Sequence, residues 1–175
     1  RAREFEVVWI GTPCSSFTVH WIGFEGGPPR TRQRPGGRES LPGWLQQYID
    51  KHNQLVKFSA EAAQAAYEAG ATYVIESPPD RGKFGSPHFR WATREHCPLW
   101  LAAPMRKLAQ VTSPLWATGA QCRCHSEFQK LTTLSAAGPR AGRILPFNKL
   151  VCNHAVHARV AAGFRRDGKP NSEEA

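Results

Sequence analysis

The sequence has no run of about 18 apolar residues, the length that a membrane-spanning helix needs, so we expect no membrane partner. It also has no charged-then-apolar leader of the kind that directs secretion. Its five cysteines are an odd set without the spacing of a disulfide framework, which indicates a reducing compartment. We therefore expect an intracellular protein, nuclear or cytoplasmic. Because position 1 is not a methionine, we also expect a piece cut from a longer chain.

The 175 residues, 41% of them hydrophobic, suffice for one domain with a real core. We predict a single domain over residues 1–164 and a polar tail over residues 165–175. The net charge of +9 favours a partner that carries phosphate, with DNA first and RNA left open. A solvated basic face without a partner is the alternative. The composition does not predict an oligomeric state.

The first half of the sequence has the pattern strand, loop, helix, strand. Residues 5–10 predict a buried strand closed by Gly11, and residues 42–69 predict a long helix that ends before Gly70. Residues 71–75 predict a second buried strand. This order implies a right-handed crossover and a parallel pair of strands.

The second half predicts fewer and shorter elements. Residues 97–111 are expected to be helical, residues 115–122 and 131–134 to form two strands, and residues 152–164 to form a short helix. The fold class that we predict is α/β, a partial Rossmann-like fold with a parallel sheet, flanking helices and a C-terminal β-hairpin.

Cys14 and Glu76 follow the two predicted parallel strands. Ligands of open parallel sheets bind beyond the carboxyl ends of the strands, so a thiol and a carboxylate are expected to face one cleft. A thiolate attacks electron-poor carbon, and a carboxylic acid can protonate a ring nitrogen to assist it. Taken alone, each residue has a simpler explanation: an inert loop cysteine, and a solvated or capping glutamate.

The segment between Cys14 and the long helix, residues 15–39, is rich in glycine, proline and arginine. A loop of this length inside a compact domain is usually functional or disordered. We predict that its arginines contact phosphates; they are Arg30, Arg32, Arg34 and Arg38.

Three segments in this order resemble the central part of the DNA cytosine-5 methyltransferases: Pro13-Cys14, Glu76-Ser77-Pro78 and Gln121-Cys122-Arg123-Cys124-His125. The resemblance implies that Cys14 attacks cytosine C6, that Glu76 bonds ring N3, and that Gln121 and Arg123 contact the base and phosphates. Ser77 stands in place of the family's usual asparagine, and His125 in place of a second arginine. We add Lys130 to the residues that contact nucleic acid. In several short sequence stretches, the chain also looks like a divergent methyltransferase-like group from mobile-element polyproteins.

The same resemblance implies S-adenosylmethionine as cofactor, within a methyltransferase fold. Four residues are assigned to it: Pro13, Ser15, Ser77 and Pro78. The family also uses a Phe-x-Gly-x-Gly turn well upstream of Pro-Cys, whereas only about a dozen residues precede Cys14 here. We therefore expect the cofactor to bind only with a missing N-terminal part, and the chain to be inactive alone.

A second group of residues could bind zinc, which prefers four thiolate or imidazole ligands. The candidates are Cys122, Cys124, Cys152, His154 and His157. The alternative is a buried Cys122 acting as a small hydrophobe, with the histidines on a surface helix. Zinc would compete with base contact by Arg123, which lies between two of the candidate ligands.

Two functions remain open: a methyltransferase-like enzyme domain, and a non-catalytic basic nucleic-acid-binding module, with or without a stabilising zinc ion. A cysteine hydrolase is a weaker third alternative, because only His20 is close to Cys14 in the sequence. Trp91, Trp100 and Trp116 are interpreted as core residues, with base stacking on one of them as the alternative.

Overall fold

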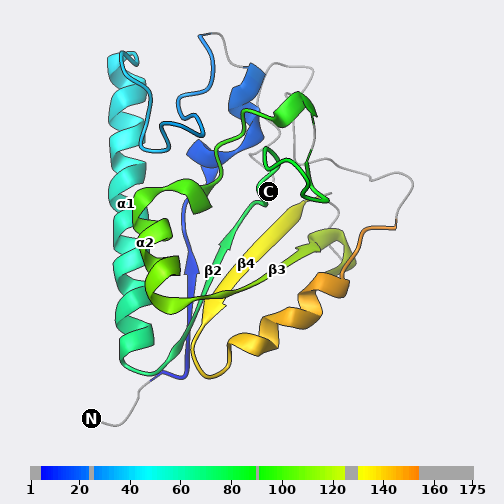
Figure 1. The fold of residues 1–175 in the computed structure, drawn as a ribbon. Helices are drawn as coiled ribbons and strands as arrows, with labels where there is room; N and C mark the ends of the chain where they lie inside the picture. Colours follow the sequence, from blue (N-terminus) through cyan, green and yellow to red (C-terminus); the bar gives the residue numbers. More distant parts are fainter. Residues whose placement is uncertain (1–4, 24–25, 90, 125–129, 154–175) are drawn as a thin grey trace.

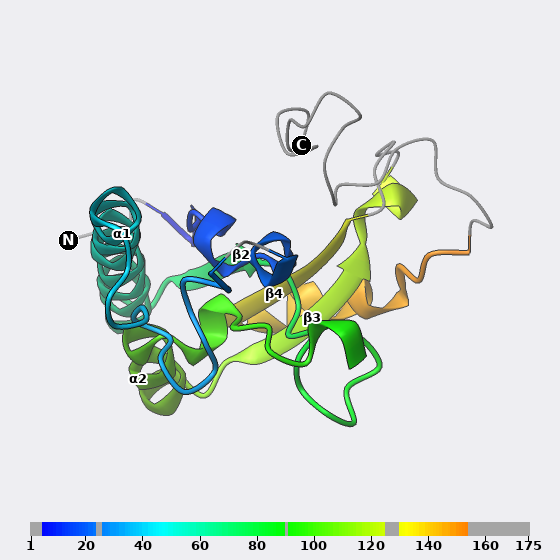
Figure 2. The ribbon, with the colours of Figure 1, turned by 90° about the horizontal axis from the view of Figure 1, so that it is seen from above.

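The computed structural model describes residues 5–23, 26–89, 91–124 and 130–153, which form a mixed α/β fold in three layers (Figure 1). The middle layer is a four-stranded sheet of order β1-β2-β4-β3. Its strands are β1 (Val7–Gly11), β2 (Thr72–Ser77), β3 (Leu115–Ala120) and β4 (Leu131–Ala137). The outer layers are α1 (Gly43–Glu68) and α2 (Ala103–Thr112) on one face and the 3-10 helix η6 (Ala141–Lys149) on the other (Figures 1 and 2). The predicted α/β class is confirmed.

The sheet is mixed, which corrects the prediction of a parallel sheet. β1 and β2 are parallel as predicted, with Gly11 opposite Glu76, and α1 provides the crossover between them. β4 is antiparallel to both of its neighbours, β2 and β3. The segment from β3 to β4 is too short for the crossover that a parallel pair requires, so these strands form the predicted hairpin. The hairpin joins the rest of the sheet through β4, which pairs with β2 in the antiparallel direction.

β1 is an edge strand and is not buried, contrary to the prediction. Val7 is 44% and Trp9 is 60% exposed, while alternate residues such as Ile10 pack against the core. The reason is that α1 covers one face of β1, whereas η6 packs on the other three strands. β2, in contrast, is central and almost completely buried, as predicted.

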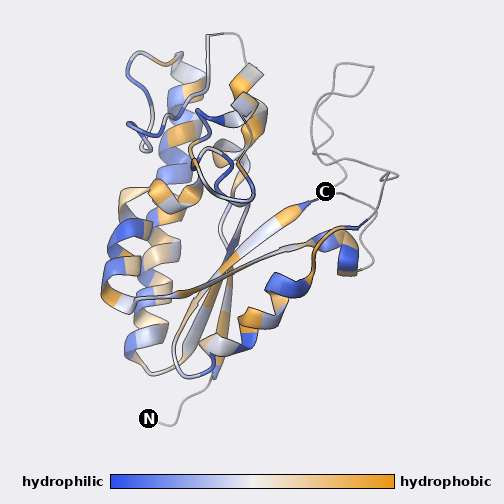
Figure 3. Cartoon of the chain, turned by 45° about the vertical axis from the view of Figure 1, so that its right-hand side comes forward, coloured by the Kyte–Doolittle hydropathy of each residue, from blue (hydrophilic) through white to orange (hydrophobic). Residues whose placement is uncertain are grey.

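The long helix α1 was predicted within one or two residues. Its buried side chains recur at helical spacing and include Leu45, Ile49, Val56 and Ala63. Figure 3 shows apolar and polar residues alternating around this helix, as expected for a helix with one buried face. Gly70, at φ +75°, ends it, and the N–H groups of Gly70 and Ala71 donate to the carbonyls of Tyr67 and Ala66.

The predicted helix over residues 97–111 is two elements. The 3-10 helix η4 (Leu99–Leu101) precedes α2, and Ala102 between them is extended, with ψ 136°. Pro104 lies in the first turn of α2, where its missing N–H is tolerated, whereas it could not stand in the interior of one helix over residues 97–111.

Two hydrophobic clusters hold the layers together. One contains Phe17, Tyr73, Ile75 and Leu99 between the sheet and the α-helices, and the other contains Leu134 and its neighbours under η6. Within the described ranges, no helix is both long and apolar enough to cross a membrane. The predicted helix over residues 152–164 and the tail over residues 165–175 lie outside the described residues, except for 152 and 153.

Candidate functional site

Cys14 lies three residues beyond the carboxyl end of β1, just before the 3-10 helix η1 (Ser15–Phe17). The Phe17 N–H donates to the Cys14 carbonyl at 2.7 Å and closes the turn. Phe17 is only 2% exposed and anchors the turn in the core. Burial of this one aromatic ring therefore fixes the backbone of Cys14, while the thiol stays only half-buried.

Glu76 is the penultimate residue of β2 and carries a half-buried carboxylate. The Thr132 hydroxyl on β4 donates to Glu76 Oε1 at 3.4 Å, and Lys130 Nζ lies 3.8 Å from the same oxygen. Gln121 Nε2 donates to Thr132 Oγ1 at 2.8 Å. A chain of polar contacts thus leads from the end of β3 through β4 to the carboxylate.

Cys14 belongs to the same group of residues. Burial raises the pKa of the Cys14 thiol, the Lys130 ammonium opposes this rise, and the Glu76 carboxylate adds to it. We call Cys14, Glu76, Gln121, Lys130 and Thr132 the thiol–carboxylate cluster. Because its pKa is raised, the thiol is predominantly protonated at neutral pH, and Lys130 is the group that favours the thiolate.

Thr132 is the member of this cluster to which the sequence assigned no site. It lies in the run Lys130-Leu131-Thr132-Thr133, which β-propensity alone explains. The alternation of side chains along β4 puts Thr132 next to Glu76, but only the pairing of β4 with β2 creates that contact.

The residues assigned to S-adenosylmethionine do not form a site for it by themselves. Ser15 Oγ accepts a hydrogen bond from the Tyr48 hydroxyl at 2.8 Å. Ser77 is 1% exposed, and its hydroxyl, like that of Thr12 just after β1, has no hydrogen-bond partner among the described residues. Pro13 and Pro78 offer no backbone N–H.

Arg30 is inside the protein, which corrects its assignment to phosphate contact. The residue is 2% exposed, and its guanidinium lies 4.0 Å from the centre of the Phe17 ring. It donates to Ser16 Oγ at 3.2 Å, to Asn53 Oδ1 at 2.8 Å and to the Pro35 carbonyl. Burial lowers the pKa of Arg30 to about 10, so the group keeps its charge at neutral pH.

Arg32 is also engaged within the protein. It makes a bidentate ion pair with Asp80, at 2.7 and 2.9 Å, and donates to the His96 carbonyl at 2.9 Å. His96, buried next to it, accepts the Arg81 N–H at Nδ1, so Nε2 carries the proton and donates to the Phe17 carbonyl at 2.8 Å. We call Arg30, Arg32, Asp80 and His96 the arginine cluster. Its hydrogen bonds and ion pair hold the segment over residues 15–39 to the rest of the fold.

The other two arginines of the loop lie closer to the surface. Arg34 is half-exposed and pairs with Glu39 at 2.6 Å. Arg38 donates to the carbonyls of Gly26 and Pro28, at 2.6 and 3.3 Å. Of the four predicted phosphate contacts, these two keep surface that a phosphate can reach.

The predicted zinc ligands are only partly within the described residues. Cys122 and Cys152 lie side by side. Burial raises the pKa of the Cys122 thiol, and a hydrogen bond with Cys152 raises it further. Arg123 Nη1 donates to Asn153 Oδ1 at 2.8 Å, which ties the 3-10 helix η5 (Gln121–Cys124) to residue 153. His154, His157 and His125 lie outside the described residues, as does the side chain of His20. Among the residues that are described, no group of three potential ligands could hold a metal.

No protein-family model, curated protein or solved structure matches this chain. Only the arrangement of its own residues therefore indicates a function.

Proposed function

We propose that this chain is a DNA cytosine-5 methyltransferase-like domain in which Cys14 attacks C6 of cytosine while Glu76 acts at N3. Two observations support it: the thiol and the carboxylate follow the carboxyl ends of two parallel strands, and the charges of Glu76 and its ion-pair partner Lys130 act on the thiol. Neither residue alone would carry the proposal.

The proposed step balances without a methyl donor. The Cys14 thiol loses its proton to solvent, and Lys130 stabilises the thiolate. The sulfur pair forms the Sγ–C6 bond, the C5=C6 pair shifts to C4–C5, and the C4=N3 pair moves to N3. Glu76 in its acid form gives N3 a proton. The product is a covalent adduct that reverses by loss of the thiolate.

Covalent capture tests this proposal. In 5-azacytosine, nitrogen replaces C5 and accepts a proton after attack, so the adduct persists. We expect the full chain to form a denaturation-resistant adduct with a 5-azacytosine oligonucleotide. Cys14→Ser should abolish the adduct and Glu76→Gln should slow its formation. Cys124→Ser is the matched control, because Cys124 is an exposed thiol elsewhere. Equal capture by the Cys14→Ser variant would refute the nucleophile.

The raised pKa of Cys14 favours a second candidate, a basic nucleic-acid-binding module without catalysis. Its binding would derive from the net charge of +9 and would weaken as salt increases. The two candidates differ in one result: the module binds oligonucleotides with the same affinity in wild-type and Cys14→Ser protein and forms no adduct in either.

A further inference from the structure

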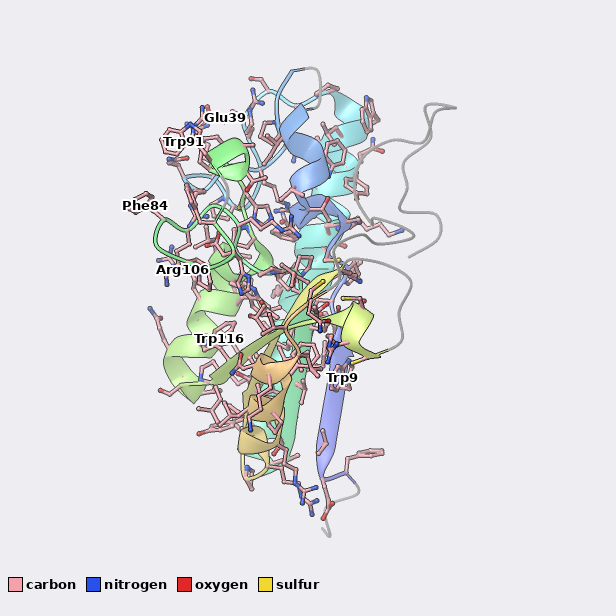
Figure 4. All side chains as sticks on the ribbon, turned by 90° about the vertical axis from the view of Figure 1, so that its right-hand side faces the viewer. Trp9, Glu39, Phe84, Trp91, Arg106 and Trp116 are labelled. Atoms are coloured by element: carbon pink, nitrogen blue, oxygen red, sulfur yellow. The ribbon has the colours of Figure 1, made fainter. Side chains whose placement is uncertain are left out.

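The segment between β2 and α2, residues 80–96, carries a group of exposed aromatic rings that the core does not use. Phe84 is 82% and Trp91 is 70% exposed, and both are at the surface in Figure 4. Phe89 lies between them, with ring centroids 5.4 Å from Phe84 and 6.3 Å from Trp91, edge to face in both pairs. We call residues 80–96 the aromatic loop. Because water surrounds its outer rings, packing of the fold does not explain them.

The base of the aromatic loop is held firmly. Asp80 at one end binds Arg32 and accepts the Gly82 N–H at 2.9 Å, and the Arg32 guanidinium also reaches the His96 carbonyl at the other end. The Thr93 hydroxyl donates to the Arg81 carbonyl at 3.1 Å and joins the two sides. A side chain at position 82 would lie 2.8 Å from both Arg32 Nη1 and the Arg94 carbonyl. The rings are therefore presented on a pre-ordered loop, which lowers the entropy cost of binding.

Positive charge accompanies the rings. Between residues 81 and 95 the sequence has Arg81, Lys83, Arg90 and Arg94 against one acidic residue, Glu95. Arg94 lies 5.5 Å from the centre of the Trp91 ring and 3.7 Å from Glu95. Lys83, adjacent to Phe84, is exposed. Aromatic faces combined with cations are the chemistry that binds unpaired bases and their phosphates.

We propose that the aromatic loop is a stacking platform for unpaired bases of single-stranded nucleic acid. Phe84 and Trp91 stack on bases, and Lys83 and Arg94 contact the neighbouring phosphates. The choice of nucleic acid as partner rests on the proposed function, but the platform itself uses neither Cys14 nor Glu76. The loop begins shortly after Ser77, the last residue of β2, so its first residues lie at the same end of β2 as Glu76.

The test is fluorescence anisotropy of labelled 20-nucleotide DNA and RNA single strands, with the corresponding duplexes, against the full chain. We expect tighter binding of single strands than of duplexes. Trp91→Ala and Phe84→Ala should each weaken single-strand binding by about 5- to 150-fold, the range expected for loss of one stacking ring. Trp91→Phe should retain most of the affinity. Phe58→Ala is the matched control, because Phe58 is a 68% exposed ring on α1, and it should bind like wild type.

Unchanged single-strand affinity in both alanine variants, or an equal loss in Phe58→Ala, would overturn the platform. So would binding to phosphatidylserine vesicles that depends on Trp91 when oligonucleotides do not bind, because the loop would then be a membrane contact. Adduct formation by Cys14 with unchanged affinity in Trp91→Ala would remove the platform and leave the proposed function. Affinity loss in Trp91→Ala without any adduct would do the reverse.

Discussion

Two polar clusters lie at the same end of the sheet and differ in how completely their atoms are paired. The arginine cluster is largely buried: Arg30 has acceptors for its N–H groups and Arg32 has a bidentate partner. In the thiol–carboxylate cluster, Glu76 has one hydrogen bond at 3.4 Å and an ion pair at 3.8 Å, and Cys14 is half-exposed.

The difference separates residues that stabilise the fold from residues that are free to react. Removing any partner of a saturated, buried polar group lowers the free energy of unfolding considerably. Removing a partner of a loosely paired, solvent-accessible group lowers it little, and such a group can exchange its partner for a ligand. By sequence alone, members of both clusters were candidates for contact with nucleic acid: Arg30 and Arg32 in one, Gln121 and Lys130 in the other.

The largest effect is expected from Arg30→Ala, which tests whether the arginine cluster stabilises the fold. The substitution removes the ring contact with Phe17 and takes a hydrogen-bond donor from Ser16 Oγ, Asn53 Oδ1 and the Pro35 carbonyl. We expect the free energy of unfolding to fall by about 3–5 kcal/mol, measured by urea denaturation. Arg34→Ala, at an exposed position, should change it by less than about 0.5 kcal/mol. Similar values for the two variants would contradict the assignment.

An intermediate effect is expected from acid. Burial lowers the pKa of His96, so the folded state takes up its proton less readily than the unfolded state does. Stability should be constant above the unfolded pKa of about 6.5 and decrease as pH falls below it towards the folded value. Thermal unfolding between pH 8 and pH 5 measures this decrease.

His96→Gln should make that dependence shallower. Burial also lowers the pKa of His52, so part of the slope should remain in the variant. A slope identical to that of the wild type would show that His96 does not support the loop as a neutral imidazole.

The smallest effect, with little change in stability, is expected in the reactivity of Cys14. Glu76→Gln removes a charge that raises the pKa of the thiol, so the midpoint of its alkylation by iodoacetamide should move to lower pH. Lys130→Gln removes the charge that lowers this pKa, so the midpoint should move to higher pH.

Opposite shifts in the two variants would establish that the three groups act as one cluster. The readout must resolve Cys14 from the other thiols by peptide mass analysis. Cys97 provides the internal reference, because burial raises its pKa to about 11 and shields it. Shifts of the same sign in both variants would show that the charges of Lys130 and Glu76 do not act on the Cys14 thiol as proposed.

Local patterns in the sequence were sufficient for several elements. The helical spacing from Leu45 to Ala63, the stop at Gly70 and the apolar run of β2 each predicted what the structure has. The parallel β1–β2 pair followed from chain order and the crossover rule. These features depend on neighbours in the chain, so the chain order is enough to predict them.

The errors concern which surface of an element is covered. The sequence could not indicate that β1 would be an edge strand or that Arg30 would be inside, because both depend on segments that pack from elsewhere. Its basic composition was the same signal whether an arginine bound a phosphate or a carbonyl group. The exposed ring of Phe84 was missed, and the interpretation of Trp91 as a core residue, with base stacking as its alternative, was wrong for the same reason, since aromatic residues usually lie in cores.

The sequence by itself determined that Cys14 and Glu76 would follow two parallel strands and face a common edge. Only the tertiary structure decided their surroundings. The hairpin places β4 against β2, which brings Thr132 and Lys130 to a carboxylate more than fifty residues away in the chain. Strand order is set by the burial of whole faces, through long-range contacts that no local pattern encodes. Those contacts turned a predicted pair of residues into a cluster whose charges act on the thiol.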